Sequence, residues 1–445
     1  MSTSFSGLGI QEEIQQALAE LKIDQPTLIQ QKAISLILQQ QKDLVVLAQT
    51  GTGKTAAFGL PLLQLVNSKH SHIQAVVLAP TRELGQQILS MIKSFATQLP
   101  ELKITGVFGG TPVKAQVEDL QQVPHILVAT PGRLLDLLER KALSLAQLSY
   151  LVLDEADEML SALKEEVELV FKATPKTRRT LLFTATLPGT IKQLAQNYMG
   201  KKVVYVEADM QTSGHQGIQH QYVVVEPIEK LEVLLHFLNT REGERGIIFC
   251  KTKAAVNKLS KKLAINKFSS GAIHGSLTQG IRDRIMGQFR EGHIQILVAT
   301  DLAARGIDVK DIAYVVNYHL PDTFDTYVHR SGRTARAGAE GFSLSILQEE
   351  EVQELSDFEE ALGIQFQSYQ KADAQSIEDN NTLLWAKKVF KTKPNREVSE
   401  ELKTKVKTIF HHLTKEELIE KSLAYYLTQK TSNSAYENSK KDKKQ

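Results

Sequence analysis

The sequence predicts an α/β protein with two tandem parallel-sheet domains and a mainly helical C-terminal extension. Three observations lead to this prediction. Short apolar runs alternate with amphipathic stretches, the alternation stops and restarts near the middle of the chain, and apolar residues near the end recur at helical spacing. A chain of 445 residues is also longer than one ordinary hydrophobic core supports.

Six short apolar runs predict the strands of the first domain. They are residues 44–48, 75–79, 126–129, 151–154, 181–184 and 203–206. Such runs between amphipathic segments are typical of a parallel sheet covered by helices. The polar stretch 209–217 has little periodicity, so we place the first domain at residues 1–208 and a linker at 209–218.

The alternation then restarts and predicts six more strands. They are residues 221–225, 246–249, 271–274, 295–299, 313–317 and 341–346. Amphipathic patterns over 251–263 and 279–290 predict helices between them. Two α/β units of similar length indicate a repeated architecture, with the second domain at residues 219–364.

The strand signal disappears after about residue 365. Apolar residues such as Leu402, Val406 and Ile409 recur at helical spacing and predict a helical extension over 365–430. The remaining residues, 431–445, are polar, and we expect a disordered basic tail.

Composition is ordinary for a soluble globular protein, with 42% hydrophobic and 23% charged residues and a net charge of +2. The one cysteine, Cys250, excludes an intramolecular disulfide and favours a reducing compartment. The N-terminus has no secretory pattern, and no apolar run approaches the ~20 residues that cross a bilayer. We therefore expect a cytoplasmic protein without a membrane partner.

A phosphate-binding loop follows the first predicted strand. Residues 48–55 read AQTGTGKT and precede a helical pattern, which is the context that such a loop requires. The glycines let backbone N–H groups converge on phosphates, Lys54 neutralises phosphate charge, and the Thr55 hydroxyl can bind Mg²⁺. The strict consensus has glycine at the position of Ala48. The expected phosphate-binding residues are Thr50, Gly51, Thr52, Gly53, Lys54 and Thr55.

An acidic run follows the strand predicted at 151–154. A carboxylate at the carboxyl end of a parallel strand faces the usual ligand crevice of an open α/β sheet. Asp154 is therefore a candidate Mg²⁺ ligand, and Glu155 is a candidate for polarising the attacking water. An acidic run alone is often only a helix start, but its pairing with the upstream phosphate loop favours catalysis.

With these two motifs the sequence resembles the DEAD-box ATP-dependent RNA helicases, which are named for the letters at 154–157. The resemblance covers about residues 4–350 and rests on a series of motifs in the family's order. It implies two recA-like domains, ATP and Mg²⁺ as cofactors, and RNA as partner. Residues 26–30, PTLIQ, resemble the family's Q motif, which implies that Gln30 reads adenine with support from Thr27 and stacking by Phe5.

The resemblance also implies an RNA-binding surface on both domains. In the first domain it comprises Pro80, Thr81, Arg82, Gly109, Gly110, Thr130, Pro131, Gly132 and Arg133. In the second it comprises Lys251, Thr252, Gln279, Arg282, Thr300 and Asp301. Hydroxyls, glycine N–H groups and basic side chains suit contacts to the RNA backbone.

Other family motifs imply residues that complete and couple the ATP site. Arg333 and Arg336 resemble arginine fingers, which stabilise charge that develops during phosphoryl transfer. Gly306 and Asp308 resemble the segment that meets the ATP ribose. The expected coupling residues are Asp157, Thr184, Thr186, Arg305 and His329, with Thr184 standing where the family has serine.

Three functions are compatible with this set of residues. The first is RNA-stimulated ATP hydrolysis coupled to local unwinding of RNA duplexes. The second is an ATP-gated RNA clamp with little unwinding, and the third is a DNA helicase or another two-domain ATPase. The Q motif and the acidic tetrad favour RNA. The C-terminal extension is expected to pack on the second domain, to bind RNA, or to contact a second copy or another protein.

Overall fold

The computed structural model describes residues 4–48, 51–200, 202–207, 217–304, 309, 312–335, 340–370 and 398–441, and also 382, 385, 386, 389, 390 and 392. The chain forms two compact units, Met1–Gln370 and Lys371–Gln445. The first unit contains two parallel sheets, and the second is helical. The predicted fold class is therefore confirmed.

The first sheet has the strand order β3-β4-β2-β5-β6-β1-β7. Its strands are β1 (Leu44–Leu47), β2 (Ala75–Leu78), β3 (Ile104–Val107), β4 (Ile126–Ala129), β5 (Tyr150–Leu153), β6 (Arg179–Thr184) and β7 (Val204–Glu207). All neighbouring strands pair in parallel. The carboxyl ends of all the strands therefore lie along one edge of this sheet.

The second sheet has the order β10-β11-β9-β12-β13-β8-β14 and is also parallel. Its strands are β8 (Ile218–Val224), β9 (Gly246–Phe249), β10 (Ser270–Ile273), β11 (Ile296–Ala299), β12 (Tyr314–Asn317), β13 (Gly341–Leu347) and β14 (Gln367–Ser368). Adding seven to each strand number of the first sheet gives the order of the second. The two domains therefore share one topology, as the repeated pattern predicts.

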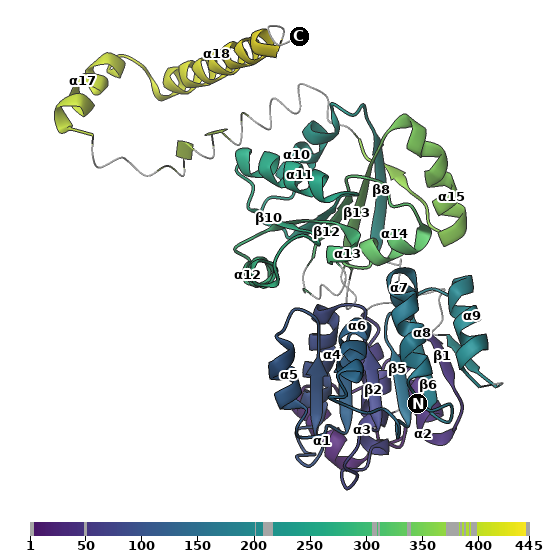
Figure 1. Ribbon diagram of the computed structural model, residues 1–445. Helices are drawn as coiled ribbons and strands as arrows, with labels where there is room; N and C mark the ends of the chain where they lie inside the picture. Colours follow the sequence, from purple (N-terminus) through teal and green to yellow (C-terminus); the bar gives the residue numbers. More distant parts are fainter. Residues whose placement is uncertain are drawn as a thin grey trace. The chain divides into compact units, whose positions relative to one another are not determined.

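Helices cover both faces of the first sheet (Figure 1). They are α1 (Glu12–Glu20), α2 (Leu28–Gln39), α3 (Lys54–Leu65), α4 (Arg82–Phe95), α5 (Val113–Asp119), α6 (Pro131–Glu139), α7 (Ala156–Ala162), α8 (Lys164–Lys172) and α9 (Gly189–Tyr198). Successive strand residues point to opposite faces, so Val46 belongs to one core cluster while Val45 and Leu47 belong to the other.

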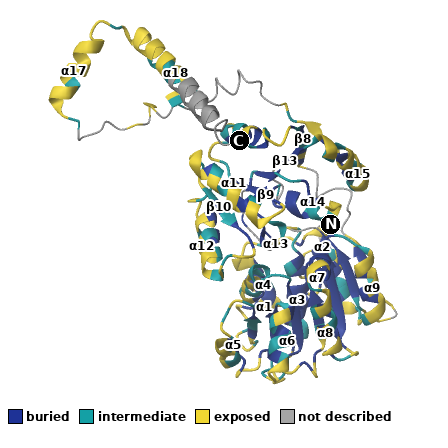
Figure 2. Ribbon diagram, turned by 45° about the horizontal axis from the view of Figure 1, so that its top comes forward, coloured by how far each residue is buried: buried dark blue, intermediate teal, exposed yellow. Residues whose placement is uncertain are grey.

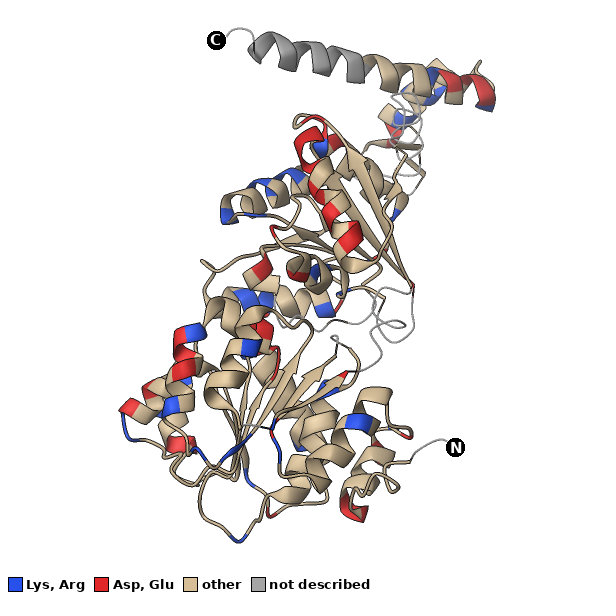
Figure 3. Cartoon of the chain, turned by 90° about the vertical axis from the view of Figure 1, so that its right-hand side faces the viewer, with Lys and Arg blue, Asp and Glu red and all other residues tan. Residues whose placement is uncertain are grey.

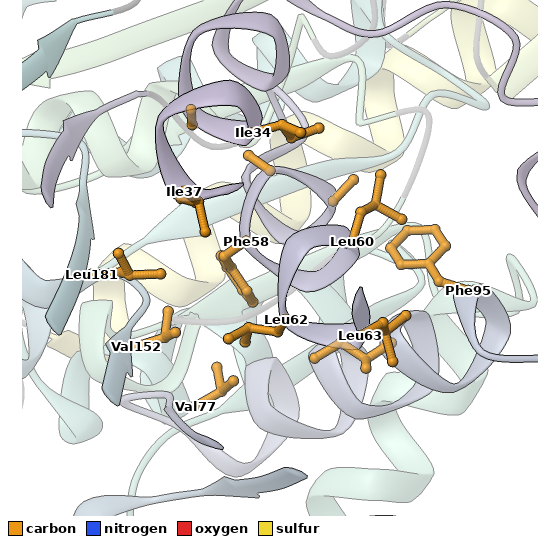
Figure 4. Close-up of a cluster of buried hydrophobic side chains, with 14 of the residues drawn as sticks. Ile34, Ile37, Phe58, Leu60, Leu62, Leu63, Val77, Phe95, Val152 and Leu181 are labelled. Atoms are coloured by element: carbon orange, nitrogen blue, oxygen red, sulfur yellow. The ribbon is translucent and has the colours of Figure 1, made fainter. Parts of the chain in front are cut away.

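The core on one face of the first sheet surrounds Phe58 of α3. Phe58 is fully buried and packs edge-on against Phe183 of β6, with 5.1 Å between the ring centroids. Figure 4 shows Ile34 and Ile37 of α2 beside it. Figure 2 shows the strands buried and the outer faces of the helices exposed. This packing fixes α3, and therefore the loop that precedes it, against the end of β1.

The helices of the second domain follow the same arrangement between strands. They are α10 (Lys230–Thr240), α11 (Lys253–Ile265), α12 (Gln279–Arg290), α13 (Asp301–Ala304), α14 (Phe324–Ser331), a short 3-10 helix (Glu349–Glu351) and α15 (Val352–Leu362). The helix predicted at 279–290 is confirmed at its full length. Among the helices in the described ranges, none has the length and apolar character needed to cross a bilayer.

Two strands, β3 and β14, were not predicted from the sequence pattern. β3 reads ITGV, where threonine and glycine interrupt the apolar run, and β14 has only two residues. The strand signal was expected to end near residue 365, and β14 corrects this because Gln367 and Ser368 pair with β8. Both strands lie at sheet edges, where only one neighbour is needed and the pattern is weakest.

The second unit contains α17 (Glu400–Phe410) and α18 (Lys415–Lys441), as the helical spacing predicts. Ser399 caps α17 by accepting a hydrogen bond from the Leu402 N–H. Trp385 stacks on Tyr426, with 4.6 Å between ring centroids. The disordered tail was expected from residue 431, whereas α18 continues to Lys441 because this stretch contains no glycine or proline to end it.

Gly246 at the start of β9 tests the packing of the second domain. A Cβ there would lie 2.0 Å from Cε2 of the buried Tyr314 ring, so we expect Gly246→Ala to lower the free energy of unfolding by about 3 kcal/mol. Gly287→Ala is the control, because that site is open and helical and should gain about 0.5–1 kcal/mol. Calorimetric unfolding measures both, and equal effects would contradict the packing argument.

Candidate nucleotide and RNA site

The order of the first sheet divides its carboxyl edge into two halves. β1, β6 and β5 are adjacent, and they lead into the phosphate loop, the Thr184–Thr186 segment and the acidic run. β2, β4 and β3 form the other half, and they lead into the segments around Thr81, Thr130 and Gly109. The predicted ATP residues and the predicted RNA residues of this domain therefore occupy neighbouring halves of one edge.

Lys54 begins α3, and its ammonium group is buried at the end of β1. Its side chain is 6% exposed, and Nζ lies 3.8 Å from Oδ1 of Asp154. Within the described ranges, Nζ has no hydrogen-bond partner. A buried ammonium group without a hydrogen-bond acceptor is costly unless a ligand supplies one. A phosphate oxygen would supply both the acceptor and the missing negative charge.

Gln30 connects the Q motif to the phosphate loop. Its Nε2 donates to the Gly53 carbonyl at 3.1 Å, and its Oε1 accepts from the Thr27 N–H at 3.0 Å. The Thr27 hydroxyl donates to the Thr52 carbonyl at 2.9 Å. Gly53 has a φ of 90°, and a Cβ there would lie 2.3 Å from Nε2 of Gln30, so only glycine fits.

The carboxamide of Gln30 keeps capacity for adenine. An amide group offers two N–H donors and two acceptor lone pairs, and these two contacts use one of each. Phe5 is 5% exposed and belongs to the hydrophobic core cluster of the first domain.

Asp154 and Glu155 follow β5 and are both buried. Burial raises the pKa of Asp154 to about 6, while Lys54 lowers it and Glu155 raises it further. Glu155 has a φ of 50°, an uncommon left-handed conformation for a residue with a side chain. Its Oε2 atom is buried without a hydrogen-bond partner in the described part of the chain. Strain and unpaired polar atoms of this kind concentrate at functional sites.

Asp157 links the acidic run to the end of β6 and to α14. Its Oδ2 accepts hydrogen bonds from the Thr186 hydroxyl at 2.9 Å and the Thr186 N–H at 3.1 Å. The same oxygen lies 3.4 Å from Nε2 of His329. Burial alone would raise the pKa of Asp157, but His329 holds it well below its ordinary value. The Thr184 hydroxyl donates to the Thr186 carbonyl at 2.7 Å, which fixes the same turn.

His329 stands between two carboxylates of the first domain. Its Nδ1 lies 3.2 Å from Oε1 of Glu158, which lies just outside the acidic tetrad at 154–157. Burial lowers the pKa of His329, but the hydrogen bond and charge of Asp157, with Glu158, raise it above its ordinary value overall. A protonated His329 therefore joins the second domain to the acidic run of the first.

Arg330 and Arg333 have separate roles on the same segment. Arg330 forms two hydrogen bonds with Asp301, at 2.5 and 2.9 Å, and another with the Asn317 side chain at 2.9 Å. Asp301 is thus held by a buried guanidinium group of its own domain. Arg333 is 6% exposed, its Nε donates to the His329 carbonyl at 3.2 Å, and it lines a small cavity with Glu158 and His329.

The predicted RNA residues of the first domain form a connected set of loops. Arg82 donates to the Gly109 carbonyl at 3.5 Å, and the Gly109 N–H donates to the Thr130 hydroxyl at 3.4 Å. Arg133 donates to the Thr111 carbonyl at 3.0 Å and to Oε1 of Gln116 at 2.6 Å. Thr81 caps α4, and Pro131 occupies the first turn of α6, next to the exposed Gly132. Pro80 is half-buried at the end of β2.

Glu83 joins these loops to the second domain. Its Oε1 lies 2.7 Å from Nε of Arg282 and accepts a hydrogen bond from Gln279 at 3.3 Å. Both partners are predicted RNA contacts, whereas Glu83 itself was not among the predicted site residues. Lys251 is exposed and pairs with Asp322 at 2.7 Å, Thr252 caps α11, and Thr300 precedes α13.

Some predicted residues lie outside the described ranges. They are Thr50, Arg305, Gly306, Asp308 and Arg336. The described residues bring Lys54, Asp154, Asp157 and His329 together, with Thr55 half-buried beside Lys54. Glu83, Glu158 and Arg330 were not predicted as site residues, although Glu83 and Arg330 lie within the motifs at 80–84 and 329–336, and Glu158 follows the acidic tetrad.

Comparison with known proteins agrees with this fold and site. Residues 27–194 match the family described as DEAD/DEAH box helicase, 229–338 match the helicase conserved C-terminal domain, and 377–432 match the helical domain of a probable ATP-dependent RNA helicase. The ATP-dependent RNA helicase DbpA of Bacillus subtilis is 39% identical over 407 residues, which cover 91% of this chain and 84% of that protein. The DEAD-box ATP-dependent RNA helicase CshA of Geobacillus kaustophilus is 38% identical over 80% of this chain and 76% of its own length.

Solved structures agree as well. Dbp5 of S. cerevisiae bound to RNA and ADP BeF3 superposes with a TM-score of 0.78 at 30% identity, covering 86% of this chain and all of that one. Mss116p bound to ssRNA and AMP-PNP gives a TM-score of 0.76 at 27% identity, covering 87% of this chain and 86% of that one.

The fold and site thus define a two-domain, ATP-dependent helicase. More narrowly, the chain belongs to the DEAD-box ATP-dependent RNA helicases, enzymes that hydrolyse ATP.

Gln30→Glu tests the link between the Q motif and the phosphate loop. A carboxylate oxygen would face the Gly53 carbonyl in place of an N–H donor, so we expect the KM for ATP to rise at least about tenfold. Gln31→Glu is the matched control, because Gln31 donates to the Pro26 carbonyl away from the loop. Steady-state ATPase assays with RNA compare the two, and similar KM values would contradict the assignment.

The His329 contacts predict a pH dependence of stability. Because the folded-state pKa lies above the ordinary value of 6.5, the stabilisation is complete below that value and is lost as pH rises through the folded pKa. We expect the difference in melting temperature between the unmodified chain and His329→Gln to shrink between about pH 6 and 9. His293→Gln, at an exposed histidine, is the control. A constant difference across this range would exclude a protonated His329.

Proposed function

We propose that ATP binds at the carboxyl edge of the first sheet, with its phosphates on Lys54 and its adenine against Gln30. The observation that carries this proposal is the buried Lys54 ammonium group, which has Asp154 at 3.8 Å and no hydrogen-bond acceptor within the described ranges. Gly51, Thr52 and Gly53 would direct backbone N–H groups at the phosphates, together with Thr50. Asp308 and Gly306 would approach the ribose, and Phe5 would stack beside the adenine.

The residues around Lys54 also fit a Mg²⁺ ion. A hydroxyl and a carboxylate are oxygen ligands of the kind that Mg²⁺ prefers, and Thr55 and Asp154 supply them. Within the described residues the Thr55 hydroxyl has no hydrogen-bond partner, so it is available. When bound, the ion would neutralise charge on the phosphates. Glu155, with its unpaired buried oxygen, would orient and polarise the attacking water.

Arginines of the second domain would complete the catalytic set. Arg333 lies on the segment that places His329 against Asp157 and Glu158, and a short shift would bring its guanidinium group toward the γ-phosphate. Arg336 follows three residues later, and Arg305 would act at the same boundary. Such groups contribute about 10³–10⁵ in rate in comparable enzymes.

RNA would lie along the other half of the carboxyl edge and on the matching loops of the second domain. Solved relatives bound to RNA together with nucleotide analogues support this arrangement. The hydroxyls, glycine N–H groups and basic side chains there suit the RNA backbone, so sequence preference should be weak and binding should depend on salt. When RNA binds, its phosphates would replace the Glu83 carboxylate as the partner of Arg282 and Gln279.

ATP and RNA would then cooperate through one equilibrium. Asp157, Thr184, Thr186 and His329 connect the acidic run to the second domain, so a ligand that favours the joined arrangement strengthens the binding of the other. Unwinding of short RNA duplexes is favoured over a pure clamp, because the curated relatives are helicases. A strand-displacement assay separates the two functions.

We further propose that a linker at 209–218 joins the first domain, 1–208, to the second domain, which extends through β14 to Gln370, and that the helical extension follows. A cytoplasmic location is supported by the single cysteine, Cys250, which forms no disulfide. A second copy or another protein would bind the extension. Support comes from α17, where Leu402, Val406, Ile409 and Phe410 are exposed.

ATPase assays with and without single-stranded RNA test the proposed function. We expect RNA but not DNA to stimulate hydrolysis, chelation of Mg²⁺ to abolish it, and Glu155→Gln to lower the rate by about 10²–10⁴-fold. Glu118→Gln, at an exposed helical carboxylate, should leave the rate unchanged. Equal stimulation by DNA would reject RNA as the specific partner, and full activity of Glu155→Gln would reject its role.

A further inference from the structure

A large basic groove lies at the edge of the first sheet opposite the nucleotide site. It is built where β1, β5 and β6 begin, and Asp43, Tyr150 and Arg179 mark these starts. Its volume is about 1020 Å³. β6 has six residues, so the groove is separated from the carboxyl edge by roughly 20 Å. None of the motifs described above contributes to it.

The charge of the basic groove is strongly one-sided. Its lining includes the six cationic side chains Lys42, Lys172, Lys176, Arg178, Arg179 and Lys202, with Asp43 as the one acidic residue. The whole chain carries a net charge of only +2, so this is a local concentration of positive charge. Figure 3 shows basic residues around the lower ends of the strands of the first domain.

The acidic residue does not neutralise the lysines. Asp43 accepts hydrogen bonds from the backbone N–H groups of Thr180 at 2.6 Å and Gly200 at 2.5 Å, so its oxygens are committed to the protein. The four lysines are exposed, and in the part of the chain that the structure describes none of them forms an ion pair. An anionic ligand would be the counter-charge that the protein itself does not supply.

A buried arginine gives the basic groove a fixed wall. Arg178 is 7% exposed, and its guanidinium donates to the Pro175 carbonyl at 2.8 Å and the Tyr198 carbonyl at 3.2 Å. The guanidinium lies 4.7 Å from the centre of the Phe171 ring, which stacks on Tyr198. Its Nε–H has no acceptor among the described residues. Solvated surface lysines are common, but a buried guanidinium with an unused donor beside them indicates a built site.

The remaining lining suits a nucleic acid better than a small anion. The volume is at the upper end of the range for pockets that enclose one small ligand. Tyr150 and Tyr198 are half-exposed and place aromatic rings among the basic side chains, a combination that binds both phosphates and bases. A free phosphate would use only a small part of this surface.

We propose that the basic groove binds the phosphate backbone of an RNA segment outside the helicase channel, anchoring a duplex or a flanking strand of the same RNA. This inference rests on the RNA helicase function and adds a second, sequence-independent contact to it. The enzyme would hold one part of an RNA at the amino edge of the sheet while acting on another part at the carboxyl edge.

The test compares two triple variants of the full-length chain. Lys172→Gln, Lys176→Gln and Lys202→Gln together remove three charges from the basic groove. Lys69→Gln, Lys93→Gln and Lys141→Gln remove three charges from exposed positions of the same domain that do not line it. The affinity of each variant is measured for two RNAs. One is a single strand of about ten nucleotides, and the other is the same strand carrying a duplex arm of about 15 base pairs, roughly 40 Å long in the A-form.

For the RNA with the duplex arm, we expect the groove variant to raise the Kd about tenfold or more and to lower the slope of log Kd against log salt by about 2–3. The Kd for the short strand, and the RNA-stimulated ATPase rate that it elicits, should stay unchanged. The control variant should resemble the unmodified chain with both RNAs.

If the two variants had the same Kd for the RNA with the duplex arm, the proposal would be wrong. The groove would then bind an acidic protein segment or only solvent. An equal loss with both RNAs would also overturn the proposal, because the lysines would then act at the helicase channel. If the short strand failed to stimulate the ATPase rate of the unmodified chain, the RNA helicase function itself would be contradicted, whatever the binding of the RNA with the duplex arm.

Discussion

Parallel strand pairing is the constraint on which the rest of this structure depends. Because every strand of the first sheet runs the same way, the loops that carry Lys54, Asp154 and Thr186 must leave from one edge. The order of the strands then places β1, β6 and β5 side by side, so that residues 100 or more positions apart in the chain become neighbours. The same order recurs in the second sheet, which delivers α14 and its His329 from an equivalent edge.

The cluster at this edge carries an electrostatic cost that the fold offsets only in part. Lys54, Asp154, Asp157 and His329 are all buried, and removing a charge from water is expensive unless partners replace the lost hydration. Asp157 has such partners in Thr186 and His329, and its pKa is depressed accordingly. Asp154 has fewer, and burial raises its pKa. The incompletely paired charges lie where a charged ligand would pair with them. The desolvation cost of burying them is therefore what a ligand-binding site would carry.

Among the described residues, charged and polar side chains connect the two recA-like domains. Glu83 approaches Arg282 and Gln279 on the RNA side, while Asp157 and Glu158 flank His329 on the nucleotide side. Each contact pairs a carboxylate of the first domain with a cationic or polar group of the second. Such contacts are exchangeable, because phosphates of ATP or RNA can replace the carboxylates. Domains joined by exchangeable contacts of this kind can therefore respond to ligands.

The sequence by itself determined the fold class, most strands, the helices of the extension and the phosphate loop. These are local signals, since apolar runs, helical spacing and the contiguous AQTGTGKT segment need no distant partner. It failed for β3, where Gly106 breaks the apolar run, and for the two-residue β14. Only the tertiary structure decided which charges meet, as with Glu158 and His329 or Glu83 and Arg282, and it alone assembled the basic groove from separate segments. The physical reason is that strand order and helix packing set these distances, whereas spacing along the chain carries no information about them.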